Sequence, residues 1–307
     1  MEKQDSARPA RQRRERVDGV LLLDKPLGMS SNQALQKAKW LLAALKAGHT
    51  GTLDPMATGL LPLTFGEATK FSADLLDADK AYEATVQFGT TTTSGDAEGE
   101  VLERRPAALS GEDVALACAA FVGEIDQIPP MHSALKRDGK PLYELARQGV
   151  EVERAPRRIT IRSIELLGFD PQVQQARIHV ACSKGTYIRV LAEDIGERLG
   201  CGAHLVALRR VAAGALALDC SITIEELEAL PLEERRAQLA RPDALLASLP
   251  AVELDAELAA RLRQGQRLAM QCPERGRVRV YGPEYILLGT ALVNEHGVLA
   301  PERLIAS

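Results

Sequence analysis

The spacing of apolar residues divides the chain into short strands and helices with one apolar face. Apolar and polar residues alternate from Tyr82 to Phe88, which predicts a strand with one buried face. Apolar residues recur at helical spacing after Ser30 and again from Ile188 to Leu199, and each run predicts a helix that buries one side. Further extended segments are expected at 20–23, 159–167, 177–182 and 204–218.

Polar residues with capping character mark where the helices begin. Ser30 or Ser31 is expected to cap the first helix, and Ser110 to open another that runs to Val122. Thr223 followed by Glu226 has the form of a capping box, which predicts an acidic helix from this point. The turn 183–186 is expected to cap the helix that follows it.

Changes in composition divide the chain into three parts. Residues 1–16 contain six Lys or Arg and few large apolar residues, so we expect a disordered basic arm. Proline breaks near 241–250 indicate a domain boundary. Beyond them, a helix at 255–263 and short strands around 278–281, 285–292 and 298–300 predict a small, mostly β unit.

The stretch from Gly48 to Pro62 is the least regular part of the pattern. It contains three glycines and two prolines, which predicts a shaped loop. Asp54 in this loop is the only acid between Asp24 and Glu67, and its neighbours are largely apolar. A carboxylate in such surroundings must either raise its pKa or find a cation. The plain interpretation of an Asp-Pro pair, however, is a turn.

Arg189 is the cation whose position is hardest to explain locally. The helix predicted after Thr186 puts it in the first turn, where the helix dipole disfavours a positive charge by about 0.3–1 kcal/mol. The position is better explained if the side chain reaches a carboxylate, the alternative being an arginine that faces solvent.

The charge balance is uneven along the chain. The net charge of −4 argues weakly against a nucleic-acid partner. Residues 131–162 nevertheless contain eight Lys or Arg against four acids, whereas residues 222–260 contain three Arg against nine acids. Such segregation suits a protein with one phosphate-facing side, although a solvated charged surface explains it equally well.

Several classes of protein do not fit the composition. The five cysteines are scattered and form no C-x-x-C pair, which favours a reduced cytoplasmic protein without a structural metal. No run approaches the roughly eighteen apolar residues of a membrane span, and no apolar stretch follows the basic N-terminus, so neither a membrane contact nor a secretory signal is expected. The chain also lacks a GxGxxG fingerprint and a P-loop.

The stretch from Gly48 to Pro62 closely resembles the catalytic loop of the TruB family, the bacterial tRNA pseudouridine synthases that act on uridine 55 of the TΨC arm. Residues 19–32 resemble the first motif of that family, which packs under the catalytic loop, and positions within 130–149 match its RNA-gripping thumb segment. The strong motifs cover residues 19–215. The C-terminal unit is similar by position to the family's PUA-type module.

The resemblance implies an α+β pseudouridine synthase fold, with a mixed, mainly antiparallel sheet flanked by helices and loops and a small C-terminal β-rich PUA-type domain. We expect the catalytic domain at 17–247, a thumb insertion at 131–158 and the PUA-type RNA-binding domain at 248–307. The expected partner is tRNA, bound through its T-arm stem-loop. We expect a monomer with no obligatory protein partner.

The resemblance also assigns roles to individual residues. Asp54 becomes the essential nucleophile, meeting Tyr82 and Arg189 in one cleft. His49 fills the space that the flipped base vacates, and Tyr187 and the backbone at Leu208 line the uridine pocket. Three arginines of the basic segment are expected to bind phosphates, namely Arg154, Arg157 and Arg158. Without the resemblance, Tyr82 and Leu208 are ordinary core residues and His49 is a solvated one.

The implied reaction limits the chemistry that the chain needs. Isomerising uridine detaches the base and rejoins it through C5, with no net redox change, so no cofactor or metal is expected. The base must first be extruded from the folded arm, at a cost of a few kcal/mol. The first step stays open between attack of Asp54 on the uracil ring, attack on the anomeric carbon and removal of a sugar proton.

Two other classes of function remain for comparison. A non-catalytic RNA-binding protein or tRNA-folding chaperone is disfavoured as the sole role by the intact Asp54 loop, but it remains a possible second role. A zinc-dependent base deaminase needs His and Cys ligands that this sequence lacks.

Overall fold

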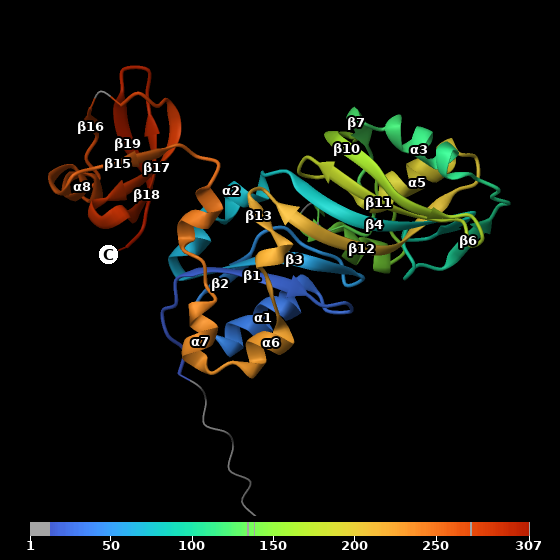
Figure 1. Ribbon diagram of the computed structural model, residues 1–307, viewed down its shortest axis with the longest axis horizontal. Coiled ribbons are helices and arrows are strands. Elements are labelled where there is room, and N and C mark those ends of the chain that lie inside the picture. The colour runs from blue at the N-terminus through green and yellow to red at the C-terminus, as the bar shows by residue number, and fades with distance from the viewer. Residues whose placement is uncertain (1–12, 134, 138, 271, 307) are drawn as a thin grey trace, which may run out of the picture.

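The computed structural model describes residues 13–133, 135–137, 139–270 and 272–306. It contains a ten-stranded sheet followed along the chain by a five-stranded sheet, which lies at one end of the molecule (Figure 1). Most of the predicted basic arm, residues 1–12, lies outside the described residues. The last part of that arm is attached to residues 17–247, the domain predicted to be catalytic and called the catalytic unit below. Glu15 forms a bridge with Ala44 and an ion pair of 2.8 Å with Arg236.

The large sheet has the order β14-β1-β3-β12-β4-β11-β10-β7, with β2 paired to β3 and β13 paired to β12. Its strands are β1 (Gly19–Lys25), β2 (Ala47–His49), β3 (Ala57–Phe65), β4 (Lys80–Phe88), β7 (Gly123–Gln127), β10 (Arg157–Asp170), β11 (Gln175–Cys182), β12 (Ala203–Ala213), β13 (Leu216–Ala217) and β14 (Ile222–Thr223). The pairs β1–β14 and β3–β12 are parallel, whereas the other pairs are antiparallel. This confirms the mixed, mainly antiparallel sheet.

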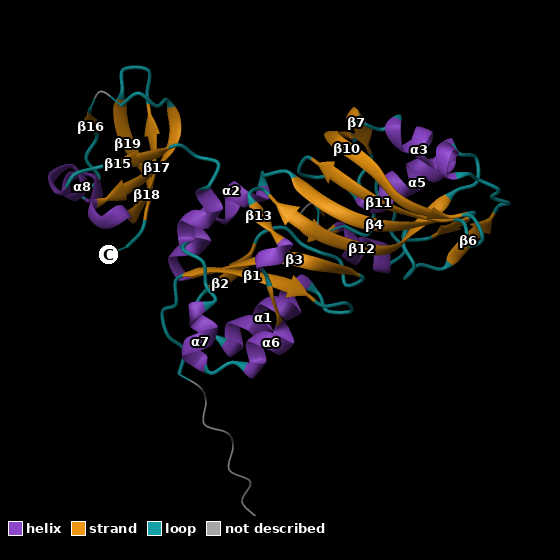
Figure 2. Cartoon of the chain, viewed as in Figure 1, coloured by secondary structure: helices purple, strands orange, loops and turns teal. Residues whose placement is uncertain are grey.

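Helices pack against this sheet near both of its ends (Figure 2). Near β1 and β3 lie α1 (Ser31–Leu41), α6 (Ile224–Ala229) and α7 (Leu232–Ala237). Towards the other end, α3 (Gly111–Ala119) packs against β10, and α5 (Ile188–Arg198) packs against β12. Capping boxes at Ser30, Ser110 and Thr223 start α1, α3 and α6, as their sequences predict.

The expected cap of α5 within 183–186 is wrong. This helix begins after Tyr187, and no side chain caps it. The Thr186 hydroxyl instead donates to the carbonyl of Ser183 at 2.9 Å, so it closes the preceding turn. Arg189 still falls in the first turn, as expected.

Shorter elements complete the catalytic unit. They are α2 (Ser72–Leu76), the hairpin of β5 (Thr90–Thr92) and β6 (Val101–Arg104), and the elements of the thumb segment: β8 (Lys136–Arg137), β9 (Lys140–Pro141) and α4 (Leu142–Arg147). The loop expected from Gly48 to Pro62 is shorter than predicted, because β3 already begins at Ala57. Only residues 50–56 are a loop. Inside β3, Gly59 has a φ of +96°, and a Cβ there would lie 2.4 Å from the carbonyl oxygen of Arg210. Glycine is therefore needed for the two strands to approach.

The C-terminal unit is a five-stranded sheet with one helix, α8 (Ala256–Arg263). Its strand order is β15 (Ala251–Glu253), β17 (Gly276–Gly282), β18 (Ile286–Val293), β19 (Val298–Leu304) and β16 (Leu268–Ala269). This confirms the small, mostly β unit.

The C-terminal unit is joined to the catalytic unit by a shared apolar cluster. Tyr281 and Leu287 pack in one cluster with Val20, Leu60 and Phe71, from strands and a turn of the catalytic unit. At its border, Arg277 of β17 forms an ion pair with the buried Asp74 of α2. The two units therefore do not sit on a free linker.

Candidate active site

The loop 50–56 is fixed from below by the segment that precedes α1. The Ser31 hydroxyl accepts from the Leu53 amide at 2.8 Å and donates to the Leu53 carbonyl at 2.9 Å. The amide of Gly28 donates to the Pro55 carbonyl at 2.8 Å. The first motif thus packs under the loop, as the resemblance implies, and it holds the backbone on both sides of Asp54.

Lys25 supports the same loop from inside the protein. Its Nζ donates to the Met29 carbonyl at 2.6 Å and reaches the Pro55 carbonyl at 3.5 Å. Burial lowers the pKa of this amine to about 8, and the charge of Asp54 opposes that shift. Lys25 therefore acts through the backbone of the loop.

Asp54 and Arg189 form the central ion pair of the site. The Oδ2 atom of Asp54 lies 2.9 Å from a terminal nitrogen of Arg189. The Asp54 side chain is 40% exposed and the Arg189 side chain only 5%, so a buried cation presents the carboxylate to solvent. From the sequence, Asp54 must either pair with a cation or have a raised pKa, and Arg189 either reaches a carboxylate or faces solvent. This pair answers both requirements.

Arg189 is itself held by three further groups. It donates to the Ser94 carbonyl at 2.9 Å and to the His132 carbonyl at 2.7 Å, and its Nε lies 3.5 Å from the carboxylate of Asp96. Asp96 is buried and accepts from the Ser94 hydroxyl at 2.5 Å and from the Glu98 amide at 3.1 Å. The guanidinium of Arg189 is thus oriented before any substrate arrives.

Tyr82 and Leu208 come from neighbouring central strands. Leu208 of β12 lies opposite Ala84 of β4, two residues beyond Tyr82, and on its other side opposite Ala57 at the start of β3. Tyr82 is partly buried against the main core. Burial raises the pKa of its hydroxyl, so the group is a neutral phenol at neutral pH.

His49 and Tyr187 lie beside the loop and beside Arg189 respectively. Burial and then the charge of Arg210 lower the pKa of His49, so its imidazole is neutral. Its Nδ1 atom is buried without a hydrogen-bond partner among the described residues. The backbone of Tyr187 is held by Gln127, which accepts from its amide at 2.8 Å and donates to its carbonyl at 3.1 Å.

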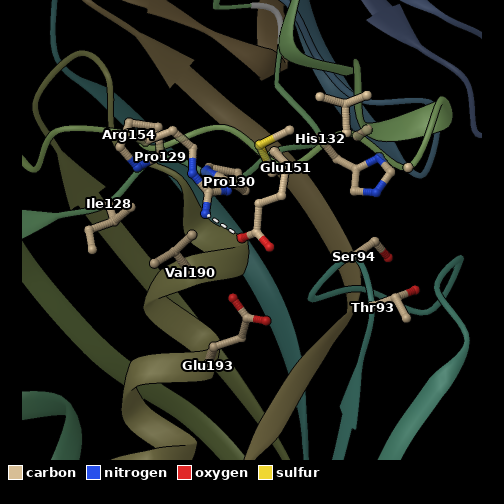
Figure 3. Close-up of a pocket in the computed structure, with 14 residues that line it drawn as sticks. Thr93, Ser94, Ile128, Pro129, Pro130, His132, Glu151, Arg154, Val190 and Glu193 are labelled. Atoms are coloured by element: carbon tan, nitrogen blue, oxygen red, sulfur yellow. Dashed lines mark hydrogen bonds and ion pairs between the residues drawn. The ribbon is translucent and has the colours of Figure 1, made fainter. Parts of the chain in front are cut away.

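A cavity of about 650 Å³ opens beside the two segments whose carbonyls hold Arg189, although neither Asp54 nor Arg189 lines it. Ser94 and His132, whose carbonyls hold Arg189, lie along its wall (Figure 3). Glu193 of α5 lines the cavity as well, and burial, together with neighbouring Asp194, raises the pKa of its carboxyl to about 7. Arg154, predicted to bind RNA, also lines it and pairs with Glu151 at 3.3 Å.

The other two predicted phosphate-binding arginines lie at the exposed start of β10. Arg158 faces Glu124 and Asp126 of β7, at 3.8 Å from each. Arg157 is exposed, and its charge acts on Tyr187. The structure thus gathers Asp54, Arg189, Tyr82, His49, Tyr187 and Leu208 around the loop, and leaves Arg157 and Arg158 at the surface.

Sequence reasoning missed three residues that support the site. The carboxylate of Asp96 lies beside Arg189, and Gln127 holds the backbone of Tyr187. Arg210 packs against the inner side of the loop, with 1% of its surface exposed. Asp96 has no local signal, because Glu98 in the same polar loop looks equivalent but is exposed. Two adjacent arginines in the extended segment expected at 204–218 are the signal that could have pointed to Arg210.

Comparisons with known proteins agree over the whole chain. Residues 39–188 match a model described as TruB family pseudouridylate synthase, N-terminal domain. Residues 189–253 match the tRNA pseudouridylate synthase B C-terminal domain, and residues 250–305 match pseudouridine synthase II TruB, C-terminal. None of the described helices is long and apolar enough to cross a membrane.

Two curated relatives are called tRNA pseudouridine synthase B. The one from Ralstonia nicotianae is 59% identical over 99% of both chains, and the one from Burkholderia mallei is 57% identical over 98% of both. A solved structure, "Crystal Structure of a Cbf5-Nop10-Gar1 Complex", matches with a TM-score of 0.72 and 25% identity over 93% of this chain and 84% of that one. The sequence, the fold and the full-length relatives together show that the chain belongs to the TruB family of pseudouridine synthases.

Proposed function

We propose that the chain isomerises uridine 55 in the TΨC arm of tRNA to pseudouridine, with Asp54 as the nucleophile and with the target base extruded from the RNA. The family and the names of the relatives support pseudouridylation of tRNA. The observation that carries the residue assignment is the half-exposed Asp54 carboxylate, held at 2.9 Å by a buried Arg189.

The reaction requires one bond to the sugar to be exchanged for another. The bond from N1 to C1′ breaks, the bond from C5 to C1′ forms, C5 loses its proton and N1 gains one. A carboxylate can act as a covalent nucleophile in such an exchange if it is ionised and oriented. Arg189 supplies a fixed positive partner for that purpose. The three first steps, at the uracil ring, the anomeric carbon or a sugar proton, are all compatible with this geometry.

The neighbours of Asp54 suit a flipped uracil. Tyr82 offers a flat face and a neutral hydroxyl, and Leu208 and Tyr187 supply apolar walls. His49 is neutral and half-buried at the edge of the loop, so it can fill the space left by the base without adding charge. Each of these roles is part of the proposal.

RNA binding is assigned to two regions outside this centre. We assign phosphate contacts to the thumb insertion 131–158 and to Arg154, Arg157 and Arg158. The unit 248–307 is assigned additional RNA affinity without a part in the chemistry. Contacts to phosphates dominate the affinity of such complexes, so they bring the T-arm to Asp54 independently of catalysis.

The test is tritium release from 5-tritiated uridine in tRNA, because C5 loses its hydrogen only if isomerisation occurs. Wild-type protein should release tritium, and Asp54→Asn should release none while binding tRNA within about tenfold of wild type, or roughly 1.4 kcal/mol. The control Asp219→Asn changes an exposed acid elsewhere and should behave as wild type. If Asp54→Asn releases tritium at the wild-type rate, Asp54 is not the nucleophile. The same variant tests a second role as a tRNA-folding chaperone, since that role should survive the loss of isomerisation.

A further inference from the structure

Arg210 of β12 is the largest of the fully buried side chains in the described part of the protein. Among the described residues, no carboxylate lies within ion-pair distance of its guanidinium, although Arg209 beside it pairs with Asp24 at 2.6 Å. A buried cation without an acid partner costs stability, and an apolar side chain of similar size would fill the space at lower cost. Packing alone therefore does not account for an arginine at this position.

The guanidinium holds the backbone on both sides of Asp54. Its Nε donates to the Leu60 carbonyl at 2.7 Å, and its Nη2 donates to the Gly51 carbonyl at 3.1 Å. Gly51 precedes Asp54 at the start of the loop, and Leu60 follows it in β3. One rigid planar group thus sets the separation between the two ends of the segment that carries the nucleophile.

Two glycines of the loop motif leave room for this contact. A Cβ at Gly51, whose φ is +78°, would lie 3.4 Å from Nη1 of Arg210. The close approach of Gly59 to the Arg210 backbone brings β3 against β12 at the same place. Gly51 and Gly59, on which the prediction of a loop rested, therefore also leave space for Arg210.

Arg210 also faces the other members of the site. It lies opposite Tyr82 in the pairing of β12 with β4, and its charge acts on the hydroxyl of Tyr82 and on the ring of His49. The other charged or titratable groups that act on Tyr82 are Cys182 from β11 and Asp54 from the loop. A single buried cation therefore contacts the loop and faces two of the side chains assigned to the flipped base.

We propose that Arg210 is a positioning residue for the isomerisation proposed above: it fixes the loop on both sides of Asp54 and keeps a positive charge behind Tyr82 and His49. Arg210 acts on the reaction only through these groups. Its loss should slow the chemical step and leave RNA binding largely unchanged, because the phosphate contacts are made elsewhere.

The test compares Arg210→Met, Arg210→Lys and the matched control Arg209→Met in single-turnover tritium release from a 5-tritiated T-arm hairpin. Arg210→Met should bind the hairpin within about threefold of wild type and react about 100-fold more slowly, the scale of effect expected when a reacting group is misplaced by about 1 Å. Arg210→Lys keeps the charge but cannot bridge both carbonyls as the planar fork does, so it should react more than about threefold more slowly than wild type, but faster than Arg210→Met. Arg209→Met should react at the wild-type rate.

A second readout separates positioning from simple packing. Burial and, after it, the charge of Arg210 lower the pKa of His49, so the pKa of His49 measured by NMR should rise in Arg210→Met and stay near the wild-type value in Arg210→Lys. A folded Arg210→Met or Arg210→Lys protein that reacts within about threefold of wild type overturns the proposal. If Arg210→Met does not fold, Arg210→Lys alone decides by the same criterion. Absence of tritium release by the wild-type protein would instead overturn the proposed function itself.

Discussion

A terminal nitrogen of Arg189 lies 2.9 Å from the exposed carboxylate of Asp54, while the rest of that guanidinium is buried among protein acceptors. The pair is therefore asymmetric. The cation is fixed by the fold, and the anion is fixed by the cation. A change that loosens Arg189 should therefore also loosen Asp54, the proposed nucleophile.

The first prediction concerns Asp96, the second carboxylate beside Arg189. Asp96→Asn removes the charge 3.5 Å from Nε, so Arg189 should be held less firmly. We expect the single-turnover rate to fall about tenfold, or roughly 1.4 kcal/mol, with little change in tRNA affinity. Glu98→Gln, which changes an exposed acid in the same loop, is the control and should keep the wild-type rate. Equal rates in folded Asp96→Asn and Glu98→Gln would show that Asp96 does not support Arg189.

The second prediction concerns the arginines assigned to phosphates. Replacing Arg154, Arg157 and Arg158 with Ala should weaken tRNA binding and flatten its dependence on salt, by about 0.7–0.9 log unit for each lost contact. Arg162→Ala provides the control, because Arg162 lies on the same strand as Arg157 and Arg158 but already pairs with Asp79 at 3.0 Å. The measurement is tRNA affinity over a range of salt concentrations. If the salt dependence of tRNA affinity has the same slope in the triple variant as in Arg162→Ala, these three arginines do not contact RNA phosphates.

The third prediction concerns pH. Burial and Asp194 raise the pKa of Glu193 from 4.5 to about 7, so the folded protein binds this proton more tightly than the unfolded chain does. The contribution of Glu193 to stability is therefore present below pH 4.5 and is lost as the pH rises through 7. Between pH 5 and pH 8, Glu193 should lower the free energy of unfolding of the wild-type protein by about 2 kcal/mol or less, and Glu193→Gln should remove this decrease.

Urea unfolding at both pH values measures this difference. Glu165→Gln changes an exposed glutamate of β10 and should leave the pH dependence as in wild type. If Glu193→Gln loses the same stability as wild type between the two pH values, Glu193 is not the group that titrates in this window.

Local chemistry predicted the features that depend on neighbouring residues in the chain. The capping boxes at Ser30, Ser110 and Thr223 use a side chain three residues away, so sequence spacing is enough to find them. For Asp54 and Arg189, local chemistry indicated only that each would gain from a partner of opposite charge, and the resemblance to the TruB family brought the two together.

Other features depend on contacts between distant segments. Arg209 and Arg210 are adjacent, and strand alternation says only that they face opposite sides. The side on which Arg210 lies is buried because residues 50–65, the loop with Asp54 and β3, pack against it. In the same way, residues 57–62 have the composition of a loop but form a strand, because β1 and β12 pair with them on both sides. Tertiary pairing here overrides local preference.

The apolar cluster between the two units joins the beginning of the chain to its end. Val20 and Leu60 lie in the first strands, whereas Tyr281 and Leu287 lie in the last unit, and Val20, Leu60 and Tyr281 have no exposed surface in the finished protein. A ribosome that stops before Tyr281 therefore releases a chain in which this cluster lacks its C-terminal members. The apolar residues left exposed in such an incomplete product make it prone to aggregation or proteolysis. Completed synthesis is thus a condition for a complete apolar cluster between the two units.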